Sequence, residues 1–102
     1  MTINGKTFDF NGTKLGNLKK LQDGIAACAE KVLEGSKKME AGLFYDGAVI
    51  QIDAFRQFFI DVVGEDVVGD CDDLALASAY FEDFQKKIVE QRDKVKKEYF
   101  RR

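Results

Sequence analysis

The sequence DCDD at residues 70–73 holds the densest group of side chains that could bind a metal ion. A calcium loop of the EF-hand type needs oxygen ligands at alternating positions, a Gly at position six and a Glu at position twelve. Counted from Asp70, position six is Ala75 and position twelve is Phe81. The calcium motif therefore fails, and we interpret these acids as capping residues of a following helix. We predict no metal site and no cofactor.

Acid–base catalysis has little support in this sequence. Histidine, the usual general base and the commonest metal ligand, is absent. Glu65, Asp66 and Asp70 could form a carboxylate pair, but such a pair needs a pocket that separates its two pKa values. A turn flanked by glycines does not indicate such a pocket, and no Gly-rich phosphate loop is present. We therefore predict that the protein is not an enzyme and has no catalytic residues.

The two cysteines, Cys28 and Cys71, have no metal-type spacing and do not make a disulfide framework. Cys28 falls on the apolar face of a predicted helix, where it acts as a small hydrophobe. The N-terminus lacks the apolar stretch of a signal peptide, and no run approaches the ~18 apolar residues that a membrane helix needs. We expect a cytoplasmic protein with no membrane partner.

Charge is unevenly distributed along the 102 residues, although the net charge is only −2. Residues 40–85 carry eleven acidic side chains and one basic side chain, whereas residues 86–102 carry eight basic and three acidic ones. Such asymmetry can steer a charged partner, or it can be compensated within or between subunits. Tyr99 and Phe100 in the basic end could stack on bases. Because the whole chain is acidic, with a pI of about 5.1, we do not expect nucleic acid as the partner and favour a solvated or oligomerising helix end.

A β-hairpin is predicted at residues 1–12, ahead of the helices that must position these groups. Asn4-Gly5 favours a type I′ turn, and the alternation that follows it places Phe8 and Phe10 on one face. An isolated hairpin is marginal in water. Its aromatic face must therefore lie on the helices or on another chain.

Apolar residues at helical spacing predict three helices, at 14–39, 47–63 and 72–100. Gly24 in the first helix could permit close approach of another backbone. The second helix is apolar over roughly 200° of its circumference, which indicates burial on more than one side. Asp46 is its expected N-cap.

The third helix would extend about 42 Å, and its basic end either projects into solvent or packs on a partner. Gly64 and Gly69 are the expected stop signals before it, and Val67-Val68 fits a short helical turn. Asp70 or Asp72 is its expected cap. The predicted fold is a single domain, residues 1–102, of the all-α class: an antiparallel helical bundle of three main helices with a short N-terminal β-hairpin.

Surplus apolar surface is expected on the second and third helices, because a domain of this size buries only part of its surface. Such surface commonly marks a partner site. The alternative is that the hairpin covers it. The side chains that we expect to bind a partner are Phe55, Phe59, Phe81, Phe84, Ile88 and Tyr99.

The opening MTINGKTFDF resembles the start of small prophage proteins from Gram-positive bacteria, which follow the pattern Met-x-Ile-Asn-Gly-x-x-Phe-x-Phe. In those proteins a charged helix comes next, then an aromatic helix ending near Phe-Phe-Asp-x-x-Phe-Gly-Glu, a Gly break and a final helix rich in Phe, Val, Glu and Lys. The counterparts here are FFIDVVGE at 58–65, then Gly69, then the helix containing residues 81–94. This sequence departs from the pattern at Ile60 and Val63.

Those prophage proteins look similar in size and helical character to the tail assembly chaperones of long-tailed phages, which are encoded just before the tape-measure protein. The resemblance implies a protein that keeps the helix-rich tape measure soluble in the host cytoplasm while tail-tube subunits assemble around it. The expected partner is the tape-measure or tail-tube protein, and we also expect a homo-oligomer. Two other functions stay open: a self-assembling structural component of the phage particle, and a small nucleic-acid-binding regulator.

Overall fold

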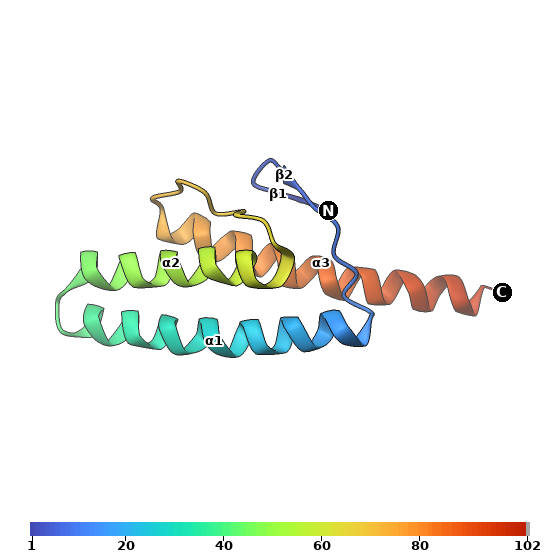
Figure 1. Ribbon diagram of the computed structural model, residues 1–102, viewed down its shortest axis with the longest axis horizontal. Helices are drawn as coiled ribbons and strands as arrows, with labels where there is room; N and C mark the ends of the chain where they lie inside the picture. The colour runs from blue at the N-terminus through green and yellow to red at the C-terminus, as the bar shows by residue number, and fades with distance from the viewer. Residues whose placement is uncertain (102) are drawn as a thin grey trace.

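A hairpin followed by three helices makes up the computed structural model, which describes residues 1–101 (Figure 1). The elements are β1 (Thr2–Ile3), β2 (Lys6–Thr7), α1 (Leu15–Glu40), α2 (Phe44–Val63) and α3 (Leu74–Phe100). The predicted all-α bundle with a short N-terminal hairpin is confirmed.

α2 is the central helix and contacts both α1 and α3. α1 and α2 are antiparallel neighbours joined by a short turn, and α3 packs on α2 as well (Figure 1). Residues 64–73 lead the chain back along α2, so α3 runs in the same direction as α2 (Figure 1). The predicted antiparallel packing therefore describes α1 and α2, whereas α2 and α3 are parallel.

The predicted caps of α2 and α3 are wrong. α2 begins at Phe44 and has Leu43 at its N-cap position, without a side-chain cap. Asp46 instead lies in the first turn, where its charge interacts favourably with the helix dipole. At α3 the cap is Asp73, whose Oδ1 accepts hydrogen bonds from Ala75 N at 2.9 Å and from Leu76 N at 3.2 Å.

The hairpin has the predicted turn but is shorter than residues 1–12. Asn4 and Gly5 have φ angles of 51° and 70°, which a type I′ turn requires. Thr2 pairs with Thr7, and Met1 and Phe8 exchange two further hydrogen bonds of 2.8 and 3.0 Å. Beyond that point the chain leaves the sheet because Phe8 and the residues after it turn onto α3.

Phe84 of α3 lies at the centre of the core. Its ring centroid lies 5.4 Å from that of Phe10, 5.6 Å from Phe59 and 5.7 Å from Phe58, at the tilted angles that aromatic pairs prefer. Phe8 is buried on the same ring, 6.1 Å away. The aromatic face of the hairpin therefore lies on the helices of its own chain.

The connection between α2 and α3 contributes two core residues. Val67 and Val68 are fully buried although they lie in irregular structure, so the predicted helical turn is wrong. The side chain of Asn4 donates a 2.8 Å hydrogen bond to Val67 O. The hairpin turn and this connection therefore hold each other in place.

Candidate partner-binding surfaces

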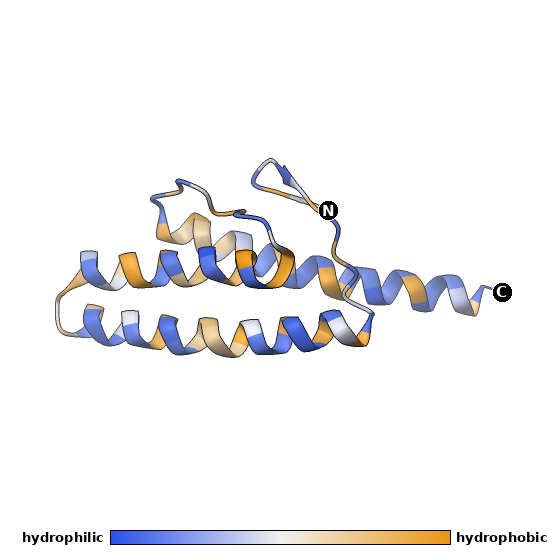
Figure 2. Ribbon diagram, in the orientation of Figure 1, coloured by the Kyte–Doolittle hydropathy of each residue, from blue (hydrophilic) through white to orange (hydrophobic). Residues whose placement is uncertain are grey.

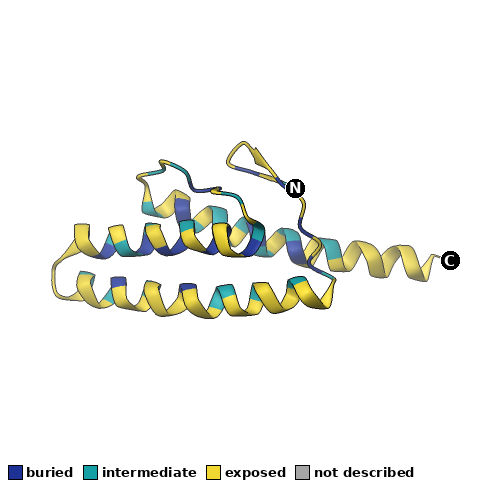
Figure 3. Cartoon of the chain, viewed as in Figure 1, coloured by how far each residue is buried: buried dark blue, intermediate teal, exposed yellow. Residues whose placement is uncertain are grey.

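Most of the predicted partner-binding side chains are buried and belong to the core. Phe55, Phe59, Phe84 and Ile88 cannot form an exposed surface, because α1 covers one side of α2 and the N-terminal segment covers α3. Phe81 is half-buried, and Tyr99 is exposed. The prediction of an exposed surface is therefore wrong for Phe59, Phe84 and Ile88, whereas buried Phe55 still lines a groove. Apolar surface does remain exposed, but at other positions (Figures 2 and 3).

The first candidate surface is a groove of about 340 Å³ between α1 and α3. Both helices pack on α2 and their backbones lie farther from each other than from α2, so a space remains between them. Phe55 of α2 and Phe81 of α3 line it, with a polar edge on α3. The lining residues from the two flanking helices are Ile25, Cys28, Ala29, Val32, Ser78, Phe81, Glu82 and Gln85. We call this the α1/α3 groove.

The α1/α3 groove is suited to binding rather than to reaction. Cys28 lies in its lining, but burial raises the pKa of this thiol to about 11. The thiol therefore stays protonated and unreactive near neutral pH. Exposed Leu33 lies one helical turn beyond Ala29, and exposed Val89 lies one turn beyond Gln85, so apolar side chains continue along both edges.

The second candidate surface is a hollow of about 460 Å³ between the first half of α2 and the residues that precede α3. Tyr45, Val49 and Ile52 are apolar parts of its lining, and Asp53 and Asp72 add negative charge. We call this the α2 hollow. Tyr45 is 80% exposed and Val49 is 48% exposed, so large apolar side chains meet solvent here.

The third candidate surface is the end of α3, residues 92–100, which we call the overhang. Every residue of the overhang is exposed, and the helix projects beyond the rest of the bundle (Figures 1 and 3). Val95, Tyr99 and Phe100 are 54%, 67% and 80% exposed. The sequence had left open whether this end projects or packs; within this chain it projects.

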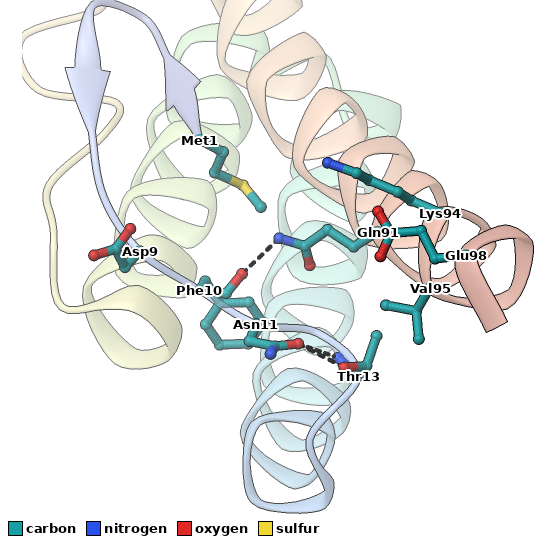
Figure 4. A pocket seen from close by; sticks show the side chains of 9 residues that line it. All are labelled: Met1, Asp9, Phe10, Asn11, Thr13, Gln91, Lys94, Val95 and Glu98. Carbon is teal, nitrogen blue, oxygen red and sulfur yellow. Dashed lines mark hydrogen bonds between the residues drawn. The ribbon is translucent and has the colours of Figure 1, made fainter. Parts of the chain in front are cut away.

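A further hollow, of about 520 Å³, lies where the N-terminal segment meets α3, and Figure 4 shows its lining. Gln91 is the key residue there. Its Nε2 donates a 2.8 Å hydrogen bond to Phe10 O, and its Oε1 accepts a 2.9 Å hydrogen bond from Gly12 N (Figure 4 draws the first). The amide of Gln91 is thus used in holding the N-terminal segment, and we assign this hollow a structural role.

Two acidic residues between α2 and α3 accept local backbone hydrogen bonds. Asp73 uses its carboxylate to cap α3, and Asp66 Oδ1 accepts a 2.9 Å hydrogen bond from Gly69 N. Across residues 1–101, no three His, Cys, Asp or Glu side chains are grouped so as to hold a metal ion. In the same range, no helix combines the length and the apolar character needed to cross a membrane.

The groove and the α2 hollow were both missed by the sequence reasoning, because each joins residues from separate elements. A partial signal was present: Ala29 and Ser78 are small residues beside the apolar stripes of their helices. Comparison of the chain with models of known protein families, with curated proteins and with solved structures finds no match.

Proposed function

We propose that this protein is a non-enzymatic tail assembly chaperone that holds amphipathic helical segments of a tape-measure protein in the α1/α3 groove. The observation that carries the proposal is the open apolar space between two helices that flank the same central helix. An amphipathic helix laid there would bury its apolar face against α1 and α3. The result would be a four-helix packing in which each helix contacts its neighbours.

The lining of the groove has side chains that suit such a client helix. Ala29 and Ser78 are small, so they leave room for large apolar side chains of the client. Glu82 and Gln85 lie on one edge, where they can interact with basic and polar side chains on the outer face of the client. Phe81, one of the residues predicted from the sequence, is the half-buried aromatic contact.

The open shape of the groove also fits the release step of a chaperone. A tail assembly chaperone must give up the tape measure when tail-tube subunits arrive. An open site that contacts only one face of the client binds it weakly. Because differences in affinity lie mostly in the dissociation rate, such a client dissociates quickly. We therefore expect the groove to bind many client segments of similar amphipathic pattern reversibly.

The proposal is tested by co-expressing the chain with a helical fragment of the tape-measure protein encoded in the same prophage. Ala29→Arg places a long charged side chain in the groove, whereas Ala27→Arg adds the same side chain to an exposed position of α1 outside it. We expect the wild-type chain and Ala27→Arg to keep the fragment soluble. Ala29→Arg should lose most of that effect.

Two results would overturn the proposal. One is equal protection of the tape-measure fragment by Ala29→Arg and Ala27→Arg, when both variants have the helical circular dichroism of the wild-type chain. The other is a gene neighbourhood without any gene for a very long helical protein. A self-assembling structural component remains the second candidate, because apolar side chains on the overhang are exposed.

A further inference from the structure

The overhang lies beside its own chain only near its start, where Lys94, Val95 and Glu98 line the hollow next to the N-terminal segment. It continues α3 for more than two turns past Gln91, and none of its residues is buried. Short helical segments gain most of their stability from packing of an apolar face, and in isolation they are marginal in water. The exposed Val95, Tyr99 and Phe100 are therefore suited to contact another molecule.

One side of this helix end combines apolar and basic residues, and Asp93 lies at its edge with Oδ1 3.7 Å from Arg92 Nε. At 100° per residue, Arg92 and Lys96 fall in the arc that runs from Val95 through Tyr99 to Phe100. Glu90 and Glu98 fall outside that arc. We call this side the overhang face; its members are Arg92, Val95, Lys96, Tyr99 and Phe100.

The α2 hollow has the complementary composition. Its apolar lining includes Tyr45, Val49 and Ile52, and Asp53 and Asp72 carry negative charge at the same site. Arg56 also lines it, but its guanidinium already donates hydrogen bonds of 2.8 and 3.1 Å to Gly69 O and lies 3.5 Å from Asp53 Oδ1. Arg56 and Asp53 therefore partly neutralise each other within the chain, and Asp72 keeps the charge of the lining net negative.

We infer that the overhang face of one copy of this chain docks on the α2 hollow of a second copy. Basic residues then meet acidic ones around an apolar contact, which orients the two chains and excludes most other registers. The overhang and the start of α2 lie at opposite ends of the long axis (Figure 1). Two antiparallel copies can therefore make the contact twice and form a closed two-fold pair.

This inference goes beyond the proposed chaperone function, since it concerns a different surface and needs no client. It is tested on the purified chain alone by light scattering and sedimentation equilibrium. Small interfaces of this kind form weak complexes, so we would measure from about 1 µM to about 1 mM protein. The mass should rise from that of one 11.5 kDa chain to twice that value.

Charge reversal identifies the two surfaces. Arg92→Glu with Lys96→Glu changes the overhang face, and Asp53→Lys with Asp72→Lys changes the α2 hollow. Each double variant should dimerise at least about tenfold more weakly than the wild-type chain, because like charges then face each other. An equal mixture of the two double variants should recover the pair, because both contacts are again between opposite charges.

Lys94→Glu with Lys97→Glu is the matched control, since it reverses two charges of the same helix outside the overhang face. It should leave the dimerisation constant within about twofold of the wild-type value. A wild-type chain that stays monomeric throughout would overturn the inference, as would a mixture that fails to recover the pair. A mass that keeps growing with concentration would contradict the closed two-fold pair. Binding of nucleic acid by the overhang, in place of a second copy, would contradict the inferred partner.

Discussion

Gly35 of α1 and Gly47 of α2 meet backbone to backbone at the helix interface. A Cβ atom added to Gly47 would lie 2.5 Å from Gly35 O, and a Cβ atom added to Gly35 would lie 2.7 Å from Gly47 O. Both residues are buried, and Gln51 fastens the same region by donating hydrogen bonds of 2.9 Å to Val32 O and 3.1 Å to Ser36 Oγ. This contact fixes how α1 lies on α2, and hence the α1 side of the α1/α3 groove.

Gly35→Ala should therefore destabilise the protein. The new methyl group meets backbone and Gln51 Cγ, 2.6 Å away, so the helices must separate, at a cost of about 2–3 kcal/mol. Gly16→Ala is the matched control on the same helix, because a Cβ atom added to Gly16 meets nothing within 4 Å. It should stabilise the protein by about 0.5 kcal/mol. Urea unfolding of the two variants measures the difference, and equal midpoints would contradict this account.

Gln91→Ala should loosen the N-terminal segment from α3. The substitution removes the side-chain amide and both of its hydrogen bonds. Phe10 O and Gly12 N are then left without their protein partner, which costs about 1–3 kcal/mol. The rate of amide hydrogen exchange at Gly12 should increase by a larger factor than the exchange rates of amides in α1 and α2. The control is Gln57→Ala, whose side chain bonds only exposed Asp61 Oδ1 at 2.8 Å and should cost less than about 0.5 kcal/mol.

Cys28 should make stability fall at alkaline pH. Burial raises the pKa of its thiol from 9.0 to about 11, so between these values the unfolded chain has released a proton that the folded chain keeps. The unfolded state then binds fewer protons, and the free energy of unfolding decreases as pH rises through this window, by up to about 2–3 kcal/mol. The contribution of Cys28 is complete below pH 9 and lost above pH 11.

Other groups also titrate in this range, so the measurement compares the wild-type chain with Cys28→Ala. Chemical denaturation at pH values from 7 to about 11 should show the two stabilities converging as pH rises. A constant difference between them would contradict the assignment to Cys28.

The elements were predictable because each depends on local signals. Helical spacing of apolar residues located all three helices within a few residues, and Asn4-Gly5 located the hairpin turn. Asp46 misled the prediction because a capping residue type is also favourable within the first turn of a helix.

The candidate site was not predictable in the same way. Periodicity shows that Phe59 and Phe84 face inward, but it does not show that Phe10 and the other N-terminal residues cover them. Buried Val67 and Val68 had no periodic signal, since they lie in irregular structure that is held by Asn4. Gly24 was expected to admit a backbone, whereas it faces the side chains of Val62 and Phe58. Long-range packing of this kind decides which apolar residues remain exposed.

The central claim is that the α1/α3 groove binds a helical client, and calorimetric titration tests it most directly. A purified amphipathic fragment of the tape-measure protein is titrated into the wild-type chain, Ala29→Arg and Ala27→Arg. The account predicts equal affinity for the wild-type chain and Ala27→Arg, with the negative heat-capacity change of apolar burial, and at least about tenfold weaker binding for Ala29→Arg. Binding of the fragment with the same affinity to all three chains would contradict it.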